Sequence, residues 1–384
     1  MPEREPVPAC ENPVWPCAMT GAADCLSGLQ GLEVVIHGSS GCYYYPASLL
    51  RASLNGTFLV EEEIVFGAEE RLREVVSGLA GENRRVAVVT TCVPSLTGED
   101  TARILEEFDA IFVDSPGFLG PYETGYALAL SRLGIRTDPE TRGVNIDGLS
   151  RFDPFATGNL IEISRLLAAA GTPVGSRLCR GTYASVSRTS AFTIESNPDL
   201  RSGAGECLGT MLGIDQVRAT SRRLEAKGLS CDISPVIAEA DAAEERVVRA
   251  CDRYLRRHDP PVAAIFSWFP YARFAADALA RYLDAGIAII GSRTGVRPSP
   301  YRSVHTIDHN LIGNLITGGE PDLLIGSSFE HSFSPETAFV PLTPPVRGRV
   351  LLRSTPVAGI EGTLAFMESV LNACMDKKDL FARS

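Results

Sequence analysis

The stretch LEVVIHGSSGC, residues 32–42, decides the expected fold, because a short run of apolar, mostly β-branched residues ends in a glycine- and serine-rich turn before a cysteine. The same order recurs in RVAVVTTC, residues 85–92. Buried strands of parallel sheets read as short continuous apolar runs, and helices connect them. The pattern therefore predicts strands over residues 32–37 and 85–91 of an α/β protein.

Strand and helix patterns alternate along the rest of the chain. Between the first strands, we expect helices over residues 68–80 and 97–108, the second capped by Thr97 with Glu99 and Asp100 in its first turn. Further strands are expected over residues 110–114, 190–196, 263–270, 286–292 and 322–328, with a helix over residues 158–171. We expect three α/β domains: residues 1–150, which carry the cluster cysteines, residues 151–260, and residues 261–384 with a C-terminal helix.

Charge and hydropathy exclude several classes of function. The chain carries a net charge of −11, which disfavours contact with nucleic-acid phosphates. No apolar run approaches the roughly 18 residues that a membrane-spanning helix needs. The first residues, MPEREPVPACENP, contain no apolar segment typical of a secretory signal, so a reducing cytoplasm is the expected location.

Three of the ten cysteines have unusual surroundings. Cys17, Cys42 and Cys92 lie among small, turn-forming or helix-starting residues, and the last two follow predicted strands. Ligands bind at the carboxyl edge of open α/β sheets, and thiolates are soft ligands for iron, zinc or copper. Because no local CxxC pair is present, the residues alone leave a shared metal site and passive thiols equally open. The other seven have no assigned role: Cys10, Cys25, Cys179, Cys207, Cys231, Cys251 and Cys374.

A family resemblance rests on these cysteine segments. CAMTGAA (17–23), HGSSGC (37–42) and TTCVPSLTGED (90–100) resemble the cluster-binding half of the nitrogenase component 1 family. Further landmarks follow in the family's order: SPGFLGPYETGY, VNIDG, DLLIGSSFE and TPVAGIEGTLAFMESVLN. The resemblance implies three nitrogenase component 1-like, Rossmann-like subdomains with parallel sheets flanked by helices. It also implies that Cys17, Cys42 and Cys92 bind an iron–sulfur cluster.

Departures from the family indicate a branch. Nitrogenase holds its iron–molybdenum cofactor through one cysteine and one histidine, and these positions fall at about Ser196 or Asn197 and at Ala358. The resemblance then implies an exchangeable substrate, and the chain looks most like the homodimeric members that reductively cyclise nickel-sirohydrochlorin a,c-diamide. Three alternatives stay open: a reductase of another tetrapyrrole or small substrate, a non-catalytic scaffold for metallocofactor assembly, and a sugar- or metal-binding protein with passive cysteines.

The resemblance also implies a partner. The chain has no GxxxxGK[ST] loop, and its only lysines are Lys227, Lys377 and Lys378, so it is expected to bind no nucleotide in the P-loop manner. ATP hydrolysis would belong to a partner that resembles nitrogenase iron protein and passes electrons to a [4Fe-4S] cluster at the subunit interface. Two chains would present six thiols, whereas the cluster needs four. Cys42 and Cys92 are the preferred ligands, followed by Cys17.

Other polar residues are weaker candidates. His37 could tune the cluster or pass a proton, or be a hydrogen-bonded structural group. Glu330 and His331 could donate protons in a pocket or lie in a solvated loop. Tyr43–Tyr45 could line a tetrapyrrole pocket or pack a dimer interface. Arginines could bind substrate carboxylates, although the chain uses Arg generally in place of Lys: Arg293, Arg297 and Arg302.

Overall fold

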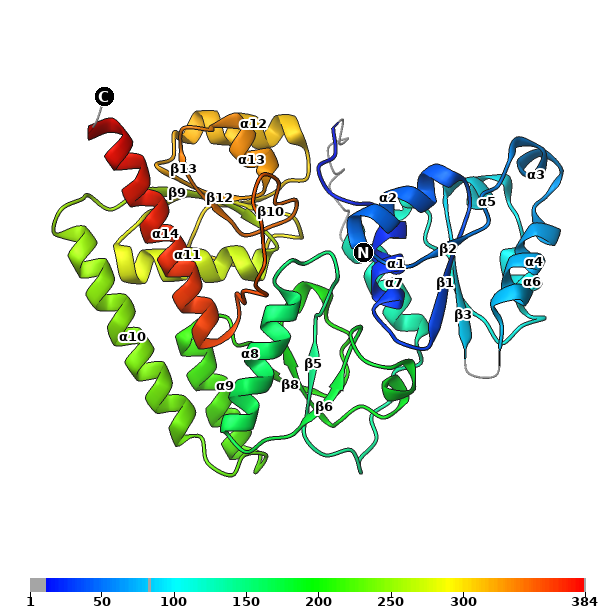
Figure 1. Cartoon of the computed structure of the whole chain (residues 1–384), viewed down its shortest axis with the longest axis horizontal. Coiled ribbons are helices and arrows are strands. Elements are labelled where there is room, and N and C mark those ends of the chain that lie inside the picture. Colours follow the sequence, from blue (N-terminus) through cyan, green and yellow to red (C-terminus); the bar gives the residue numbers. More distant parts are fainter. Residues whose placement is uncertain (1–11, 82–83, 383–384) are drawn as a thin grey trace. The chain divides into compact units, whose positions relative to one another are not determined.

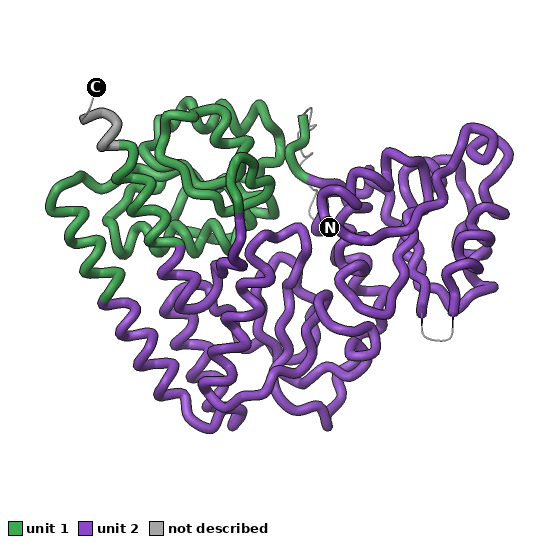
Figure 2. The backbone as a smooth tube through the Cα atoms, viewed as in Figure 1, with its two compact units in different colours: residues 1–15, 246–350, 366–384 green, residues 16–245, 351–365 purple. Residues whose placement is uncertain are grey.

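The structure is a computed structural model that describes residues 12–81 and 84–382 (Figure 1). Cys10 lies outside the described residues. The chain divides into two compact units, coloured separately in Figure 2. Unit 1 consists of Met1–Trp15, Arg246–Val350 and Phe366–Ser384, and unit 2 of Pro16–Glu245 and Leu351–Ala365. Among the described helices, none is long and apolar enough to cross a membrane.

The first sheet of unit 2 carries the cysteine segments. It has the order β2-β1-β3-β4, and every pairing is parallel. The strands are β1 (Leu32–His37), β2 (Asn55–Gly56), β3 (Arg85–Thr90) and β4 (Ile111–Val113). Residues 32–37 pair one to one with residues 85–90, so β1 and β3 end at the same edge. The apolar runs of these central strands are buried, as parallel sheets covered on both faces require.

Helices cover both faces of this sheet (Figure 1). On one face, α4 (Glu69–Leu79) and α6 (Thr101–Leu105) bury Leu72, Val76 and Ile104 against Val35 and Val88. On the other lie α1 (Ala18–Ser27) and α7 (Tyr122–Arg132), which pack on each other. Gly21 and Gly125 permit this close approach, because a Cβ at either position would overlap backbone atoms of the facing helix.

A second parallel sheet completes unit 2, with the order β6-β5-β7-β8. Its strands are β5 (Val144–Asp147), β6 (Val174–Arg177), β7 (Phe192–Glu195) and β8 (Glu206–Gly209). Helices α8 (Ala156–Ala169) and α9 (Ile214–Ala226) belong to the same unit. Each of these two helices buries an apolar stripe that contacts the unit's core.

Unit 1 contains the third sheet, in the order β11-β10-β9-β12-β13, again parallel throughout. Its strands are β9 (Val262–Ser267), β10 (Gly286–Ser292), β11 (Ser303–His305), β12 (Leu323–Gly326) and β13 (Ala338–Pro341). Its helices include α11 (Phe269–Leu283), α12 (His309–Gly319) and α13 (Ser328–Phe333). Two long helices, α10 (Ser234–Leu255) and α14 (Gly359–Ala382), contribute residues to both units.

The predicted fold class, three parallel sheets flanked by helices, is confirmed. The domain boundaries at residues 150 and 260 stay a prediction. One helix prediction is wrong: residues 97–108 do not form one helix capped by Thr97. Instead α5 (Cys92–Thr97) ends at Gly98, which has φ +75°, and α6 starts after Asp100, whose carboxylate accepts a hydrogen bond from the Arg103 N–H. The left-handed glycine is what ends the first helix.

A buried carboxylate ties α1 to the loop that follows β5. Asp24 accepts hydrogen bonds from the hydroxyls of Tyr122 and Ser150 and from the backbone N–H groups of Arg151 and Phe152. Burial, and then the charge of Asp24, raises the pKa of Tyr122 well above its ordinary value, so its hydroxyl remains a donor. Four donors compensate the cost of burying this carboxylate.

Candidate functional site

Three cysteines lie at helix starts around the first sheet. β1 ends at His37, and α2 (Ser40–Leu50) then carries Cys42 in its first turn. β3 ends at Thr90, and Cys92 is the first residue of α5. Cys17 occupies the N-cap position of α1.

Two of the three thiols converge on one glycine. Gly117 follows β4 and opens the short 3-10 helix η1 (Gly117–Leu119). A Cβ placed on Gly117 would lie 3.1 Å from the Cys92 Sγ and 3.3 Å from the Cys17 Sγ. The Gly117 N–H also donates a hydrogen bond of 3.1 Å to the Cys92 Sγ. Both thiols therefore border one small space that the missing side chain leaves open.

Cys42 lies at the same end of the sheet but outside this pair. The described residues include no group of three or more His, Cys, Asp or Glu side chains that could hold a metal ion. α2 nevertheless contacts α1, the helix that Cys17 caps, and burial followed by Cys17 raises the pKa of Tyr45 on α2. The part of the chain that the structure describes thus brings together two of the three predicted ligands and leaves the third partly exposed nearby.

Replacing Gly117 with alanine tests this convergence. The new methyl group would contact both sulfur atoms closely, and we expect the iron bound after anaerobic purification to fall by more than half. Gly117 does not have a positive φ, so backbone strain does not contribute. Gly78→Ala is the matched control, because a Cβ there meets no atom within 4 Å. Full iron content in Gly117→Ala would show that the space between the thiols is not used.

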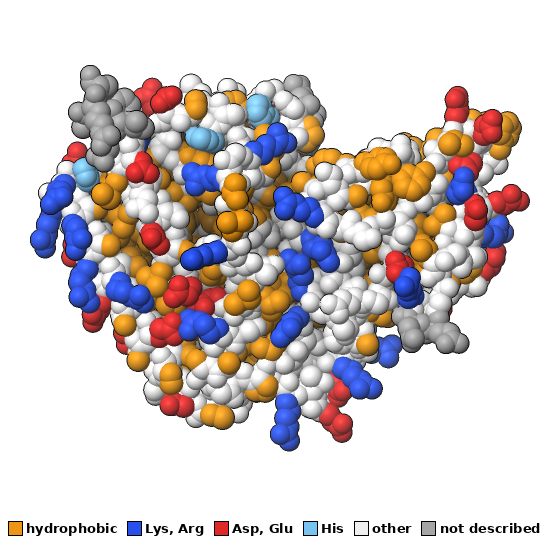
Figure 3. Space-filling view, in the orientation of Figure 1, with side chains coloured by type: hydrophobic (Ala, Val, Ile, Leu, Met, Phe, Trp, Pro, Cys, Tyr) orange, Lys and Arg blue, Asp and Glu red, His pale blue; other side chains and the backbone are white. Residues whose placement is uncertain are grey.

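A groove lined by apolar and acidic side chains lies beside Cys92. It has a volume of about 570 Å³, and α3 (Glu61–Phe66) and α5 form its walls. Phe66 is 87% exposed, and Leu96 on α5 is 74% exposed. Four acidic residues also line the groove: Glu63, Glu69, Glu99 and Asp100. Figure 3 shows hydrophobic side chains gathered over α2 and the region of α3, so this face of unit 2 combines apolar and acidic groups.

His37 is fully buried and hydrogen bonded through both ring nitrogens. Its Nδ1 lies 3.1 Å from the Thr57 Oγ1, and its Nε2 lies 2.8 Å from the Glu99 Oε1. No ring nitrogen is left for a substrate. Both ring nitrogens therefore have protein partners, and a role of His37 in tuning a cluster or passing a proton stays a prediction.

Glu330 and His331 lie in unit 1, where Glu330 is buried and His331 is half-buried. They belong to α13, where the buried Glu330 pairs with the buried guanidinium of Arg293 and accepts the Ser327 backbone N–H. His331 stacks on Phe339, with ring centroids 4.3 Å apart. The solvated-loop alternative is therefore wrong for Glu330, because an ion pair and a helix cap hold it inside. Arg293 is likewise committed to an internal partner.

Ser196 and Ala358, the two positions at which no cofactor ligand is expected, both contact the buried side-chain amide of Asn159. The Asn159 Nδ2 donates to the Ser196 Oγ over 3.1 Å, and the Asn159 Oδ1 accepts the backbone N–H groups of Val357 and Ala358. Glu162, one turn further along α8, accepts the N–H groups of Ile360 and Glu361 at the start of α14. Hydrogen bonds through Asn159 thus link Ser196 to Ala358.

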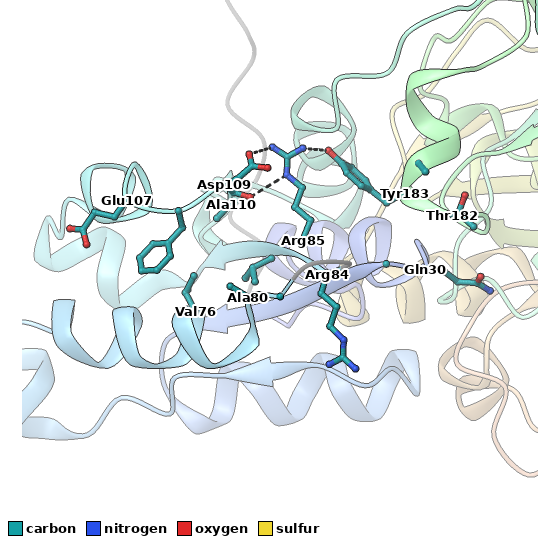
Figure 4. A pocket seen from close by; sticks show the side chains of 15 residues that line it. Gln30, Val76, Ala80, Arg84, Arg85, Glu107, Asp109, Ala110, Thr182 and Tyr183 are labelled. Carbon is teal, nitrogen blue, oxygen red and sulfur yellow. Dashed lines mark hydrogen bonds and ion pairs between the residues drawn. The ribbon is translucent and has the colours of Figure 1, made fainter.

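A cavity of about 590 Å³ lies at the opposite edge of the first sheet (Figure 4). Arg85, the first residue of β3, reaches into it but is held by the Asp109 carboxylate and the Tyr183 hydroxyl, each 2.5 Å away. None of the described residues that line this cavity is a cysteine. The cavity is therefore separate from the thiol edge.

Comparisons with known proteins show the family to which the chain belongs. The family described as nitrogenase component 1 type oxidoreductase matches residues 17–375. The nitrogenase molybdenum-iron protein beta chain of Sinorhizobium fredii is 30% identical over 187 residues, which cover 42% of this chain and 36% of that one. The nitrogenase iron-molybdenum cofactor biosynthesis protein NifE of Clostridium pasteurianum is 22% identical over 343 residues, covering 79% of this chain and 72% of NifE.

The fold comparison extends over almost the whole chain. A solved structure described as nitrogenase Cp1 at pH 6.5 superimposes with a TM-score of 0.80 at 17% identity, covering 98% of this chain and 95% of that chain. The sequence match spans only about a third of the length of the beta chains, whereas the fold match is nearly complete. Because the family match covers most of the sequence, the chain belongs to the nitrogenase component 1 type oxidoreductase family.

Proposed function

We propose that this chain is the catalytic, electron-accepting component of a two-component ATP-dependent reductase in the cytoplasm. The observation that carries the proposal is the convergence of the Cys17 and Cys92 thiols on Gly117 at the carboxyl edge of the first sheet. Two thiols and a backbone N–H around one open point suit a site for iron and sulfide. A bound cluster would supply one-electron transfer.

The ligand set requires a second chain. The described residues of one chain provide a pair of thiols and the nearby Cys42, whereas a [4Fe-4S] cluster takes four ligands. In a homodimer with the cluster on the two-fold axis, each copy supplies half of the ligands from the same three cysteines. The exposed side chains of Tyr44 and Tyr45 on α2 fit the interface interpretation of the tyrosine run.

The groove between α3 and α5 is the proposed docking place of the reductase partner, which resembles nitrogenase iron protein and hydrolyses ATP. An exposed phenylalanine surrounded by carboxylates favours a partner surface with an apolar centre and a basic rim. Cys92 begins α5, one wall of the groove, so a docked partner would lie close to the thiols.

Replacing Phe66 with aspartate is expected to lower the ATP-dependent reduction rate at least tenfold without changing the iron content. Phe66 is almost fully exposed, so the substitution costs little folding energy but places a charge where the partner's apolar surface would be buried. Ile161→Asp, which alters an exposed apolar side chain on α8, is the control. If Phe66→Asp and Ile161→Asp both reduced substrate at the wild-type rate, the partner would not dock at this groove.

The proposed substrate is a nickel tetrapyrrole, nickel-sirohydrochlorin a,c-diamide, which the enzyme would reduce and cyclise. The supporting observation is that Ser196 and Ala358 provide no metal ligand and are linked through Asn159, so these two positions offer a fixed metal cofactor no side chain that would hold it. The test is an anaerobic assay with this tetrapyrrole, the reductase component and ATP. ATP-dependent formation of the cyclised product supports the proposal. If the protein reduces only a different tetrapyrrole, the proposed substrate is wrong.

A second candidate is a scaffold on which a metallocofactor is assembled. The similarity to NifE, which covers 79% of this chain, favours it. A scaffold would bind and hand on a cluster without ATP-dependent turnover of a tetrapyrrole. Transfer of iron and sulfide to an acceptor protein, with no reduction of the nickel tetrapyrrole, would establish this alternative.

A further inference from the structure

His37 joins four segments at the end of β1. Its backbone C=O accepts the N–H of Thr91, the N-cap of α5, over 3.1 Å. Its Nδ1 meets the Thr57 hydroxyl, whose oxygen also accepts the Gly38 N–H over 3.0 Å. Its Nε2 meets Glu99 in the turn between α5 and α6. One fully buried residue thus contacts the segments before α2, before α3, before α5 and after α5.

The two cysteine segments are packed together at the same point. A Cβ on Gly38 would lie 1.9 Å from the Thr91 Oγ1, so these two residues are in direct contact. Gly38 is followed by Ser39, the N-cap of the helix that carries Cys42, and Thr91 precedes Cys92. Any shift of His37 or Gly38 must therefore move both cysteine segments.

Glu99 connects this point to the groove. Its side chain is 9% exposed and lines the groove between α3 and α5, while its Oε1 lies 2.8 Å from the His37 Nε2. The other acidic groups around the groove make different contacts, since Glu69, for example, pairs with Arg73 and Arg103. Of the four acidic residues of the groove, Glu99 is the one that is hydrogen bonded to His37.

We propose that the His37–Glu99 pair is a positioning pair that links occupancy of the groove to the placement of Cys42 and Cys92. A basic side chain of a docked partner would compete with His37 for the Glu99 carboxylate and release both cysteine segments together. The coupling rests on the proposed docking of a partner, whereas the restraint on the two cysteines does not. His37 and Glu99 act through the segments that they hold and touch no substrate.

Thiol alkylation of the metal-free chain tests the restraint. In Glu99→Ala, we expect iodoacetamide to modify Cys42 and Cys92 at least tenfold faster, because a buried charge-assisted contact no longer opposes local opening. Cys207 and Cys231, which are exposed elsewhere in unit 2, should react at the unchanged rate. Glu99→Gln keeps a hydrogen-bonding side chain and should restore most of the protection, and Glu69→Ala should leave all four rates unchanged.

Unchanged rates at Cys42 and Cys92, or equal acceleration at all four cysteines, would overturn the positioning role. If Glu99→Ala fails to fold, His37→Asn provides the same comparison with the carboxylate retained. Iron and sulfide analysis of the wild type and these variants distinguishes failure of the proposed function from failure of the positioning role. A wild-type protein without a cluster would contradict the proposed function, but the alkylation rates would still test the positioning role.

The coupling has its own readout in the loaded homodimer. Adding the reductase component should change the paramagnetic resonance spectrum of the wild-type cluster, and the same addition to Glu99→Ala should leave the spectrum unchanged. If Glu99 had only a structural role, the spectrum of Glu99→Ala would already differ from that of the wild type before the partner is added. Adding the partner would then change the spectra of both proteins in the same way. An identical response in both proteins would contradict the coupling.

Discussion

Replacement of Cys92 with alanine is expected to remove the iron–sulfur absorption of the anaerobically purified dimer and to reduce its iron content to near zero. Cys92 is one of the two thiols that meet at Gly117, and it receives the Gly117 N–H. On a two-fold axis, one substitution deletes a thiolate from both chains, so a four-iron cluster held by Cys92 and one other cysteine of each chain loses two of its four ligands. Absorption spectroscopy with iron and sulfide analysis measures the loss.

Cys207→Ala is the matched control for this experiment. Cys207 is exposed on β8 of the second sheet, where it pairs with Thr193, and it belongs to the same unit as Cys92. We expect its iron content and spectrum to equal those of the wild type. A Cys92→Ala dimer with an unchanged spectrum and unchanged iron would remove Cys92 from the ligand set and with it the assignment of this edge as the cluster site.

Asp24→Ala is expected to lower the free energy of unfolding by about 2–5 kcal/mol, because each buried donor left without an acceptor costs about 1–3 kcal/mol. The substitution would leave two backbone N–H groups without their acceptor, and the hydroxyls of Tyr122 and Ser150 would keep only their contact with each other. These donors lie on α7 and in the loop after β5, so the loss loosens the packing of α1 in unit 2. Urea denaturation followed by circular dichroism measures the change.

Two further variants identify the cause of the destabilisation. Glu70→Ala, on the exposed side of α4, should change the free energy of unfolding by no more than about 0.5 kcal/mol. Asp24→Asn, which keeps an acceptor oxygen, should cost less than Asp24→Ala. If Asp24→Ala were as stable as Glu70→Ala, the carboxylate would not be the anchor between α1 and the second sheet.

Much of the fold was predictable because buried parallel strands leave a local pattern. The runs at residues 32–37, 85–90 and 286–292 are short, apolar and followed by turns, and each forms a central strand. The same pattern placed Cys42 and Cys92 after the ends of β1 and β3. Local signals failed at Gly98, where one left-handed residue divides the expected helix into α5 and α6.

The contacts that complete the site were not predictable, because they join residues distant in sequence. Gly117 meets Cys17 and Cys92 only after three segments fold together, and the landmark SPGFLGPYETGY that contains it gave no sign that this glycine contacts the thiols. Asn159, which reaches Ser196 and Ala358, lies in an ordinary amphipathic helix pattern. For Glu330, the pattern suggested exposure, but its partner Arg293 lies 37 residues away.

The central claim is that two copies of this chain hold one iron–sulfur cluster through thiols at the edge of the first sheet. The most direct test is iron and acid-labile sulfide analysis of the untreated protein, purified without oxygen, together with its mass in solution. The account predicts a homodimer with about four iron and four sulfide per two chains. A protein free of iron and sulfide under these conditions, with its cysteines fully reduced, would contradict it.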